Sequence, residues 1–146
     1  MQKVETLKMP VMPMSQIVYG EVVYWITILA AIITIIGPAL ALIFTENNVM
    51  NPVGTLTSIF AGMSPAEVWA NSKDGAFPGG HFYLSNLFTG DGFTQFGIAL
   101  GCGVALPGLL ASSLVYMKDK AFGFVALSLW VAALVFLSAS GLVNIH

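Results

Sequence analysis

The side chains best suited to chemistry lie close together in one Gly-rich stretch, 78–92. It contains His81, Tyr83 and Asp91, and histidine and aspartate can act as metal ligands or as acid and base partners near neutral pH. A single histidine in such a loop more often has a structural hydrogen bond. Three interpretations therefore stay open: a structural role, contact with a neighbouring extracytoplasmic subunit, and catalysis or metal binding.

The rest of the chain offers little polar chemistry. Of its 146 residues, 57% are hydrophobic and 8% are charged, whereas ordinary soluble domains carry about 25% charged residues. The charged residues avoid three runs completely: 22–44, 93–116 and 121–143. This composition excludes a nucleic-acid binder with a basic face, a disulfide-stapled secreted module and a soluble enzyme with its own core.

Each uncharged run is about 23 residues long and would span roughly 35 Å as a helix, enough to cross a hydrocarbon core of about 30 Å. The sequence therefore predicts an all-α integral membrane protein with one membrane domain, 1–146, and three transmembrane helices at those positions. The intervening segment 45–92 is too long to be a structureless loop.

Positive charge indicates the orientation, because Lys residues near span ends remain cytoplasmic. Lys3, Lys8, Lys118 and Lys120 would share one side, opposite Lys73. We expect a cytoplasmic N-terminal segment (1–21), an extracytoplasmic loop (45–92) and an extracytoplasmic C-terminus at His146. The localisation expected is a prokaryotic cytoplasmic membrane.

Two connections are readable in more detail. The connector 117–120 is so short that the second and third spans must form an antiparallel hairpin. In the long loop, Ser64, Pro65 and Glu67 have the spacing of a capping box. This predicts a short helix over about 65–72 with Trp69 facing a membrane surface or a partner.

Small residues mark a packing face on the second span. Gly97, Gly101 and Ala105 recur at every fourth position, and Gly103 adds a second groove. Close approach at small residues drives helix association in lipid. The face could join the second and third spans or receive another polypeptide. Pro107, like Pro38 in the first span, should kink or loosen its helix.

No Asp, Glu, Lys, Arg or His lies inside the three runs, which argues against a proton path or ion pump formed by this chain alone. Haem in a membrane usually requires axial histidine, and the two histidines, His81 and His146, lie outside the runs. Cys102 cannot pair within the chain. We therefore predict no catalytic, cofactor-binding or metal-ligating residue, although such a chain could contact lipid or a quinone.

A resemblance covers Phe96 to Val143. Its features are an apolar run with a central Pro107, the triplet 113–115 (Ser-Leu-Val), a Lys-Asp-Lys hairpin and an apolar span ending in small residues. This pattern resembles an uncharacterised family of small bacterial and archaeal membrane proteins, whose members often accompany sulfite-type exporters. The resemblance implies no functional residues.

These observations favour a non-catalytic accessory subunit of a larger membrane complex, and we expect that complex to be a quinone-linked, energy-transducing electron-transfer complex of a respiratory chain. The expected partners are other integral membrane subunits, an extracytoplasmic subunit and lipids, with no nucleic acid. The interaction residues predicted are Gly97, Gly101, Gly103, Ala105, His81, Tyr83, Asp91 and Trp69. The alternative is a small transport component, either an exporter partner or a homo-oligomeric pore.

Overall fold

The computed structural model describes residues 11–72 and 75–141, and within them the chain is helical with no strand. The chain divides into two compact units, which are described separately. One contains residues up to Tyr24 together with those from Ala105 onward, and the other contains Trp25–Val104. Lys3, Lys8 and Lys73, used above to predict the orientation, lie outside the described residues, as does His146.

Three stretches are long and apolar enough to cross a membrane, the number that the sequence predicts. They are α1 (Met14–Ile43), the pair α4 (Gly90–Cys102) and α5 (Ala105–Lys118), and α6 (Phe122–Ala139). Their boundaries differ from the predicted ones. Helix α1 begins before residue 22, since the carbonyl of Pro13 accepts the first amide bonds, so the helix includes Glu21.

The second span is two helices, not the single helix predicted over 93–116. It begins at Gly90, because the Thr89 hydroxyl caps its first turn by accepting the amide of Gly92 at 3.1 Å. It is interrupted at 103–104, before Pro107. Pro107 thus lies in the first turn of α5, where a missing amide hydrogen costs little. Pro38, by contrast, lies inside α1, which continues past it to Ile43.

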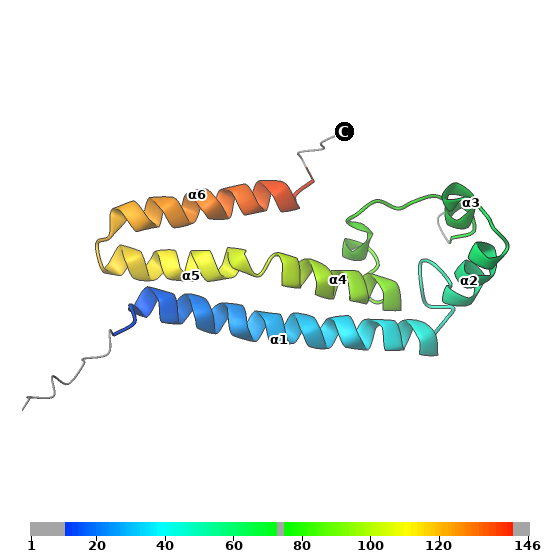
Figure 1. Cartoon of the computed structure of the whole chain (residues 1–146), viewed down its shortest axis with the longest axis horizontal. Helices are drawn as coiled ribbons and strands as arrows, with labels where there is room; N and C mark the ends of the chain where they lie inside the picture. Colours follow the sequence, from blue (N-terminus) through cyan, green and yellow to red (C-terminus); the bar gives the residue numbers. More distant parts are fainter. Residues whose placement is uncertain (1–10, 73–74, 142–146) are drawn as a thin grey trace, which may run out of the picture. The chain divides into compact units, whose positions relative to one another are not determined.

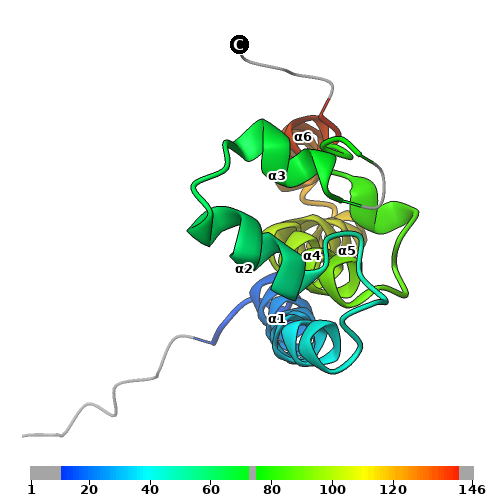
Figure 2. The ribbon, with the colours of Figure 1, turned by 90° about the vertical axis from the view of Figure 1, so that its right-hand side faces the viewer.

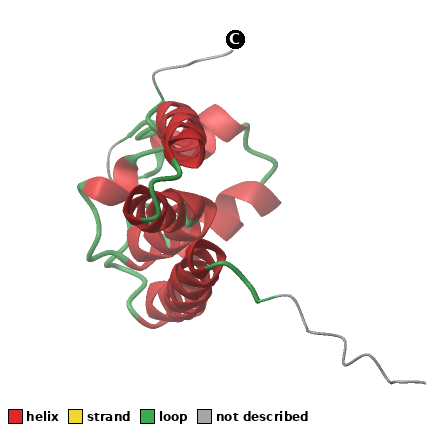
Figure 3. Ribbon diagram, turned by 90° about the vertical axis from the view of Figure 1, so that its left-hand side faces the viewer, coloured by secondary structure: helices red, strands yellow, loops and turns green. Residues whose placement is uncertain are grey.

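Helices α5 and α6 form the predicted antiparallel hairpin (Figure 1). The turn is closed by Lys120, whose φ is 56°, and by the Ala121 amide, which donates to the Tyr116 carbonyl at 2.9 Å. The rings of Tyr116 and Phe124 stack across the hairpin with centroids 5.4 Å apart. Figure 3 views this end of the chain, with α5 between α6 and the beginning of α1.

The segment between α1 and α4 contains more helix than predicted (Figures 1 and 2). The capping box of Ser64 and Glu67 is present and starts α3 (Pro65–Ala70), slightly shorter than expected. Helix α2 (Pro52–Phe60) and the 3-10 turn η1 (Phe82–Leu84) were not predicted. The signal for α2 was the pair Asn51-Pro52, an N-cap followed by proline at the first helical position.

Few side chains are buried. Among the described residues, the buried hydrophobic ones are Ala30, Ile33, Val49, Val125 and Ala132. Apart from Val49 they lie on the long helices, and all are small or β-branched. The helices therefore contact one another along narrow faces and leave their large apolar side chains outward.

Candidate functional site

Asp91 lies in the first turn of α4 and acts as a hydrogen-bond acceptor for backbone amides. Its Oδ2 accepts from the Met50 amide at 3.0 Å, and its Oδ1 accepts from the Gly92 amide at 2.9 Å. A carboxylate in the first turn is also favoured by the helix dipole. Each oxygen of Asp91 thus already has a protein donor, so the residue joins the segment after α1 to the start of α4.

Asn48 completes this polar joint, and the sequence analysis did not single it out. It is 2% exposed, and its Nδ2 lies 2.9 to 3.1 Å from the carbonyl oxygens of Ala41, Phe44 and Thr45 at the end of α1. Its Oδ1 accepts the Asp91 amide at 3.3 Å. One side chain therefore satisfies the open carbonyls of α1 and an open amide of α4. A pair of asparagines within four residues of the end of the apolar run 22–44 was the available signal.

His81 and Tyr83 belong to a different cluster from Asp91's hydrogen-bond network. The His81 ring lies 6.2 Å from that of Tyr83, which in turn lies 6.3 Å from the ring of Phe96 in α4. These aromatic contacts attach η1 to α4. Among the described residues, no group of three or more His, Cys, Asp or Glu side chains is placed to hold a metal ion.

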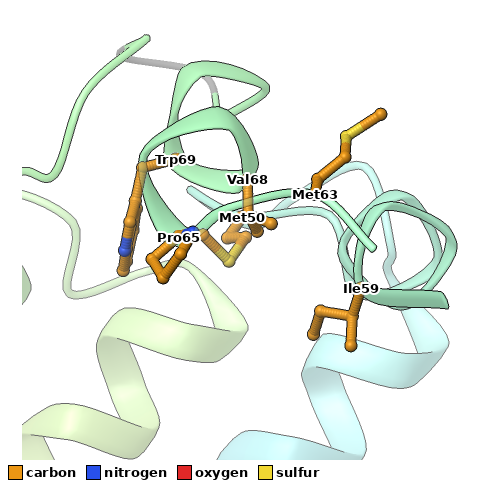
Figure 4. A pocket seen from close by; sticks show the side chains of 6 residues that line it. All are labelled: Met50, Ile59, Met63, Pro65, Val68 and Trp69. Carbon is orange, nitrogen blue, oxygen red and sulfur yellow. The ribbon is translucent and has the colours of Figure 1, made fainter. Parts of the chain in front are cut away.

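Trp69 lies on α3 and packs edge-on against Phe77, with ring centroids 4.9 Å apart. It lines an open apolar hollow of about 280 Å³. Figure 4 shows Pro65, Val68 and Met50 beside one another there, while the Met63 side chain points away from them. The hollow is lined by Met50, Ile59, Met63, Pro65, Val68 and Trp69.

Glu67 holds the beginning of α3 in place. Its Oε2 accepts from both the amide and the hydroxyl of Ser64 at 2.7 Å. The Ser64 hydroxyl, followed by the Ser64 amide, lowers the pKa of this fully exposed carboxyl below its usual value of 4.5. These hydrogen bonds favour the charged form.

The glycine face of the second span packs within the chain against α1. A Cβ on Gly97 would lie 2.6 Å from Thr34 Oγ1, and one on Gly101 would lie 3.6 Å from the Ala30 Cβ. The expectation that these two glycines join the second and third spans is therefore wrong. The close approaches form an antiparallel series in which Gly90, Thr94, Gly97 and Gly101 face Ala41, Gly37, Thr34 and Ala30.

The α1 half of this series was not predicted, because the sequence analysis considered only Pro38 within the first span. The spacing of Ala30, Thr34, Gly37 and Ala41 is itself that of one helical face. Gly103 ends α4, with its amide donating to the Ala99 carbonyl at 2.9 Å, and Ala105 begins α5. These two residues mark the helix interruption.

Comparisons with known proteins give a family but no described activity. A family model matches residues 15–142. An uncharacterised protein of the archaeon Archaeoglobus fulgidus is 35% identical over 102 residues. The match covers 68% of this chain and 64% of the archaeal protein, so it spans less than two thirds of that relative's length. No solved structure matches the chain. The chain therefore belongs to an uncharacterised protein family.

Proposed function

We propose that this chain is a non-catalytic, membrane-spanning accessory subunit of a larger membrane complex, specifically a quinone-linked electron-transfer complex. The observation that carries the proposal is the small share of each apolar helix that is buried within the chain. In the most apolar window of each span, 17% of the residues are buried. The remaining apolar surface must be covered by lipid or by other subunits.

Helix α6 illustrates this surface. Its contact with α5 buries Val125 and Ala132, while Trp130 and Phe136 are 67% and 61% exposed. Large apolar side chains surround the helix on its other sides, as expected of a helix in contact with hydrocarbon. Lipid alone can account for this exposure.

The segment between α1 and α4 argues for a protein partner. Phe60 and Phe88 are 86% and 92% exposed, although they lie beyond the ends of the apolar helices. The polar joint of Asn48 and Asp91 fastens the end of α1 and residue Met50 to the start of α4, and the exposed aromatics lie on the segment between these two anchored ends. Exposed aromatic side chains on a rigid element are typical anchors of protein interfaces.

The proposal is tested by purifying the tagged chain from its own host's membranes in mild detergent, followed by native electrophoresis and identification of the accompanying subunits. We expect a complex that contains other membrane subunits and a quinone-reactive oxidoreductase. Phe60→Asn with Phe88→Asn should release the extracytoplasmic partner, whereas Thr57→Asn, an exposed polar change on α2, should retain it. A single monomeric species would contradict the proposal.

A second candidate, a small transport component, is favoured by one observation. The span formed by α4 and α5 is interrupted at 103–104, and discontinuous membrane helices often supply polar backbone groups to transported substrates. Sulfite flux into liposomes that contain only this chain would support transport. The accessory-subunit proposal expects none.

A further inference from the structure

A hollow of about 250 Å³ lies where the beginning of α1 meets α5 and α6. It belongs entirely to the unit formed by residues up to Tyr24 and from Ala105 onward. All but one of its lining side chains are polar, on helices composed mainly of apolar residues. The lining consists of Ser15, Gln16, Tyr19, Leu109, Ser112, Tyr116 and Ser128.

The walls of the hollow are held by specific contacts. A Cβ on Gly108 would lie 2.9 Å from the ring of Tyr19, so the absence of a side chain there lets the ring approach α5. The Ser112 hydroxyl, on a residue 4% exposed, donates to the Ser15 carbonyl at 3.1 Å and joins α5 to α1. Stacking on Phe124 orients Tyr116. The hollow is therefore part of the packed structure.

Most of the polar side chains in this lining are unpaired. No hydrogen bond joins the side chains of Ser15, Gln16, Tyr19, Tyr116 or Ser128 to another residue that the structure describes. No buried side-chain oxygen or nitrogen among the described residues is sealed off without a partner, so these groups reach open space. An occupant that bonds to these groups gains hydrogen bonds that the chain itself does not make, which makes a hydrogen-bonding occupant favourable.

The lining also defines the chemistry of the occupant. It contains hydroxyl, phenol and amide donors but no Asp, Glu, Lys, Arg or His, so it suits a neutral molecule with hydrogen-bond-accepting oxygens. A cavity of about 150 Å³ accommodates benzene. A space of about 250 Å³ is therefore suited to a substituted ring and is smaller than most drug-sized sites.

We infer that this hollow binds the head group of a quinone, with its ring carbonyls accepting hydrogen bonds from Tyr19 and Tyr116 and its tail extending into lipid. The inference rests on the proposed function in one respect, the placement of α1, α5 and α6 in a membrane. It adds a binding site on this chain itself, which an accessory subunit need not have.

The test uses the purified full chain in lipid nanodiscs and a short-tailed 1,4-naphthoquinone, measured by equilibrium binding. Tyr19→Phe and Tyr116→Phe should each weaken binding about five-fold, the equivalent of one neutral hydrogen bond. Tyr83→Phe, the same chemical change outside the hollow, should leave binding unchanged. Ser128→Leu, which fills the space, should abolish it.

Two results would overturn the inference. One is equal binding of the matching naphthalene without carbonyl groups, which would indicate an apolar groove only. The other is absence of quinone binding in nanodiscs, since lipid would then be the preferred occupant. A chain that purifies alone but binds quinone through Tyr19 would defeat the accessory-subunit proposal and leave this site standing. A chain that purifies within a complex but binds no quinone would defeat this inference and leave the accessory-subunit proposal standing.

Discussion

The joint at Asn48 and Asp91 and the hollow at Tyr19 and Tyr116 both place polar side chains among apolar helices, but they use them in opposite ways. At the joint, the side-chain amide of Asn48 and both oxygens of Asp91 bond to backbone groups. At the hollow, the side chains of two tyrosines and of most of their polar neighbours make no hydrogen bond to another described residue. Paired groups fix the fold, and unpaired groups in a shaped space are available to a ligand.

The largest effect that would sharpen this comparison is expected at Asn48. Asn48→Leu keeps the approximate size but leaves buried carbonyls at the end of α1 and the Asp91 amide without their partner. We expect the free energy of unfolding to fall by about 3 kcal/mol, since buried unsatisfied groups cost about 1–3 kcal/mol each. Unfolding in mixed detergent micelles, followed by circular dichroism, measures the change.

Asn47 provides the matched control for this experiment. It is the neighbouring asparagine, exposed, and its side chain donates one bond to the Phe88 carbonyl at 3.0 Å. Asn47→Leu should cost about 1 kcal/mol or less. Equal losses at the two positions would show that burial of the joint contributes nothing beyond a single surface hydrogen bond.

A somewhat smaller effect is expected where α4 approaches α1. In Gly97→Ala the new Cβ would lie 2.6 Å from Thr34 Oγ1 and 2.8 Å from Ile33 Cγ2. The helices must separate, at a cost of about 2 kcal/mol, typical of overpacking. In Gly101→Ala the nearest atom is 3.6 Å away, an ordinary contact, so its unfolding curve should match that of the unmodified chain. A loss of stability in Gly101→Ala as large as that in Gly97→Ala would contradict the conclusion that the closest approach of α4 to α1 lies at Gly97.

These positions show what the sequence could and could not predict. The number of helices long and apolar enough to span a membrane, the hairpin at 117–120 and the capping box at Ser64 follow from local composition and spacing, and the structure confirms them. The sequence did not predict that the helix face containing Gly97 packs against α1, because residue spacing identifies a packing face but not the helix that it contacts. Asp91 was recognised as notable, but its role depends on Asn48, which is distant in sequence.

The polar hollow was missed for a related reason. Ser15, Tyr19, Ser112 and Ser128 are spread over three helices that are distant in sequence, and none interrupts an apolar run strongly enough to stand out. Only packing places them together. The search for ionisable residues in the spans could not detect a site made from neutral hydroxyl and amide groups.

The smallest effect is expected at the exposed start of α3, which lies outside both the joint and the hollow. Because Ser64 holds the pKa of Glu67 below 4.5, the stabilisation of α3 by this carboxylate is complete above pH 4.5 and is lost as the pH falls through the lowered pKa. In a chain carrying Trp25→Phe and Trp130→Phe, Trp69 fluorescence should change in that acid range, since Trp69 packs on Phe77 from α3. Glu67→Gln retains a capping oxygen that does not titrate, so the transition should disappear. A fluorescence transition that persists in Glu67→Gln would belong to another titrating group. A transition that disappears in Glu67→Gln, with the Asn48 joint intact, would show that the acid sensitivity is confined to α3.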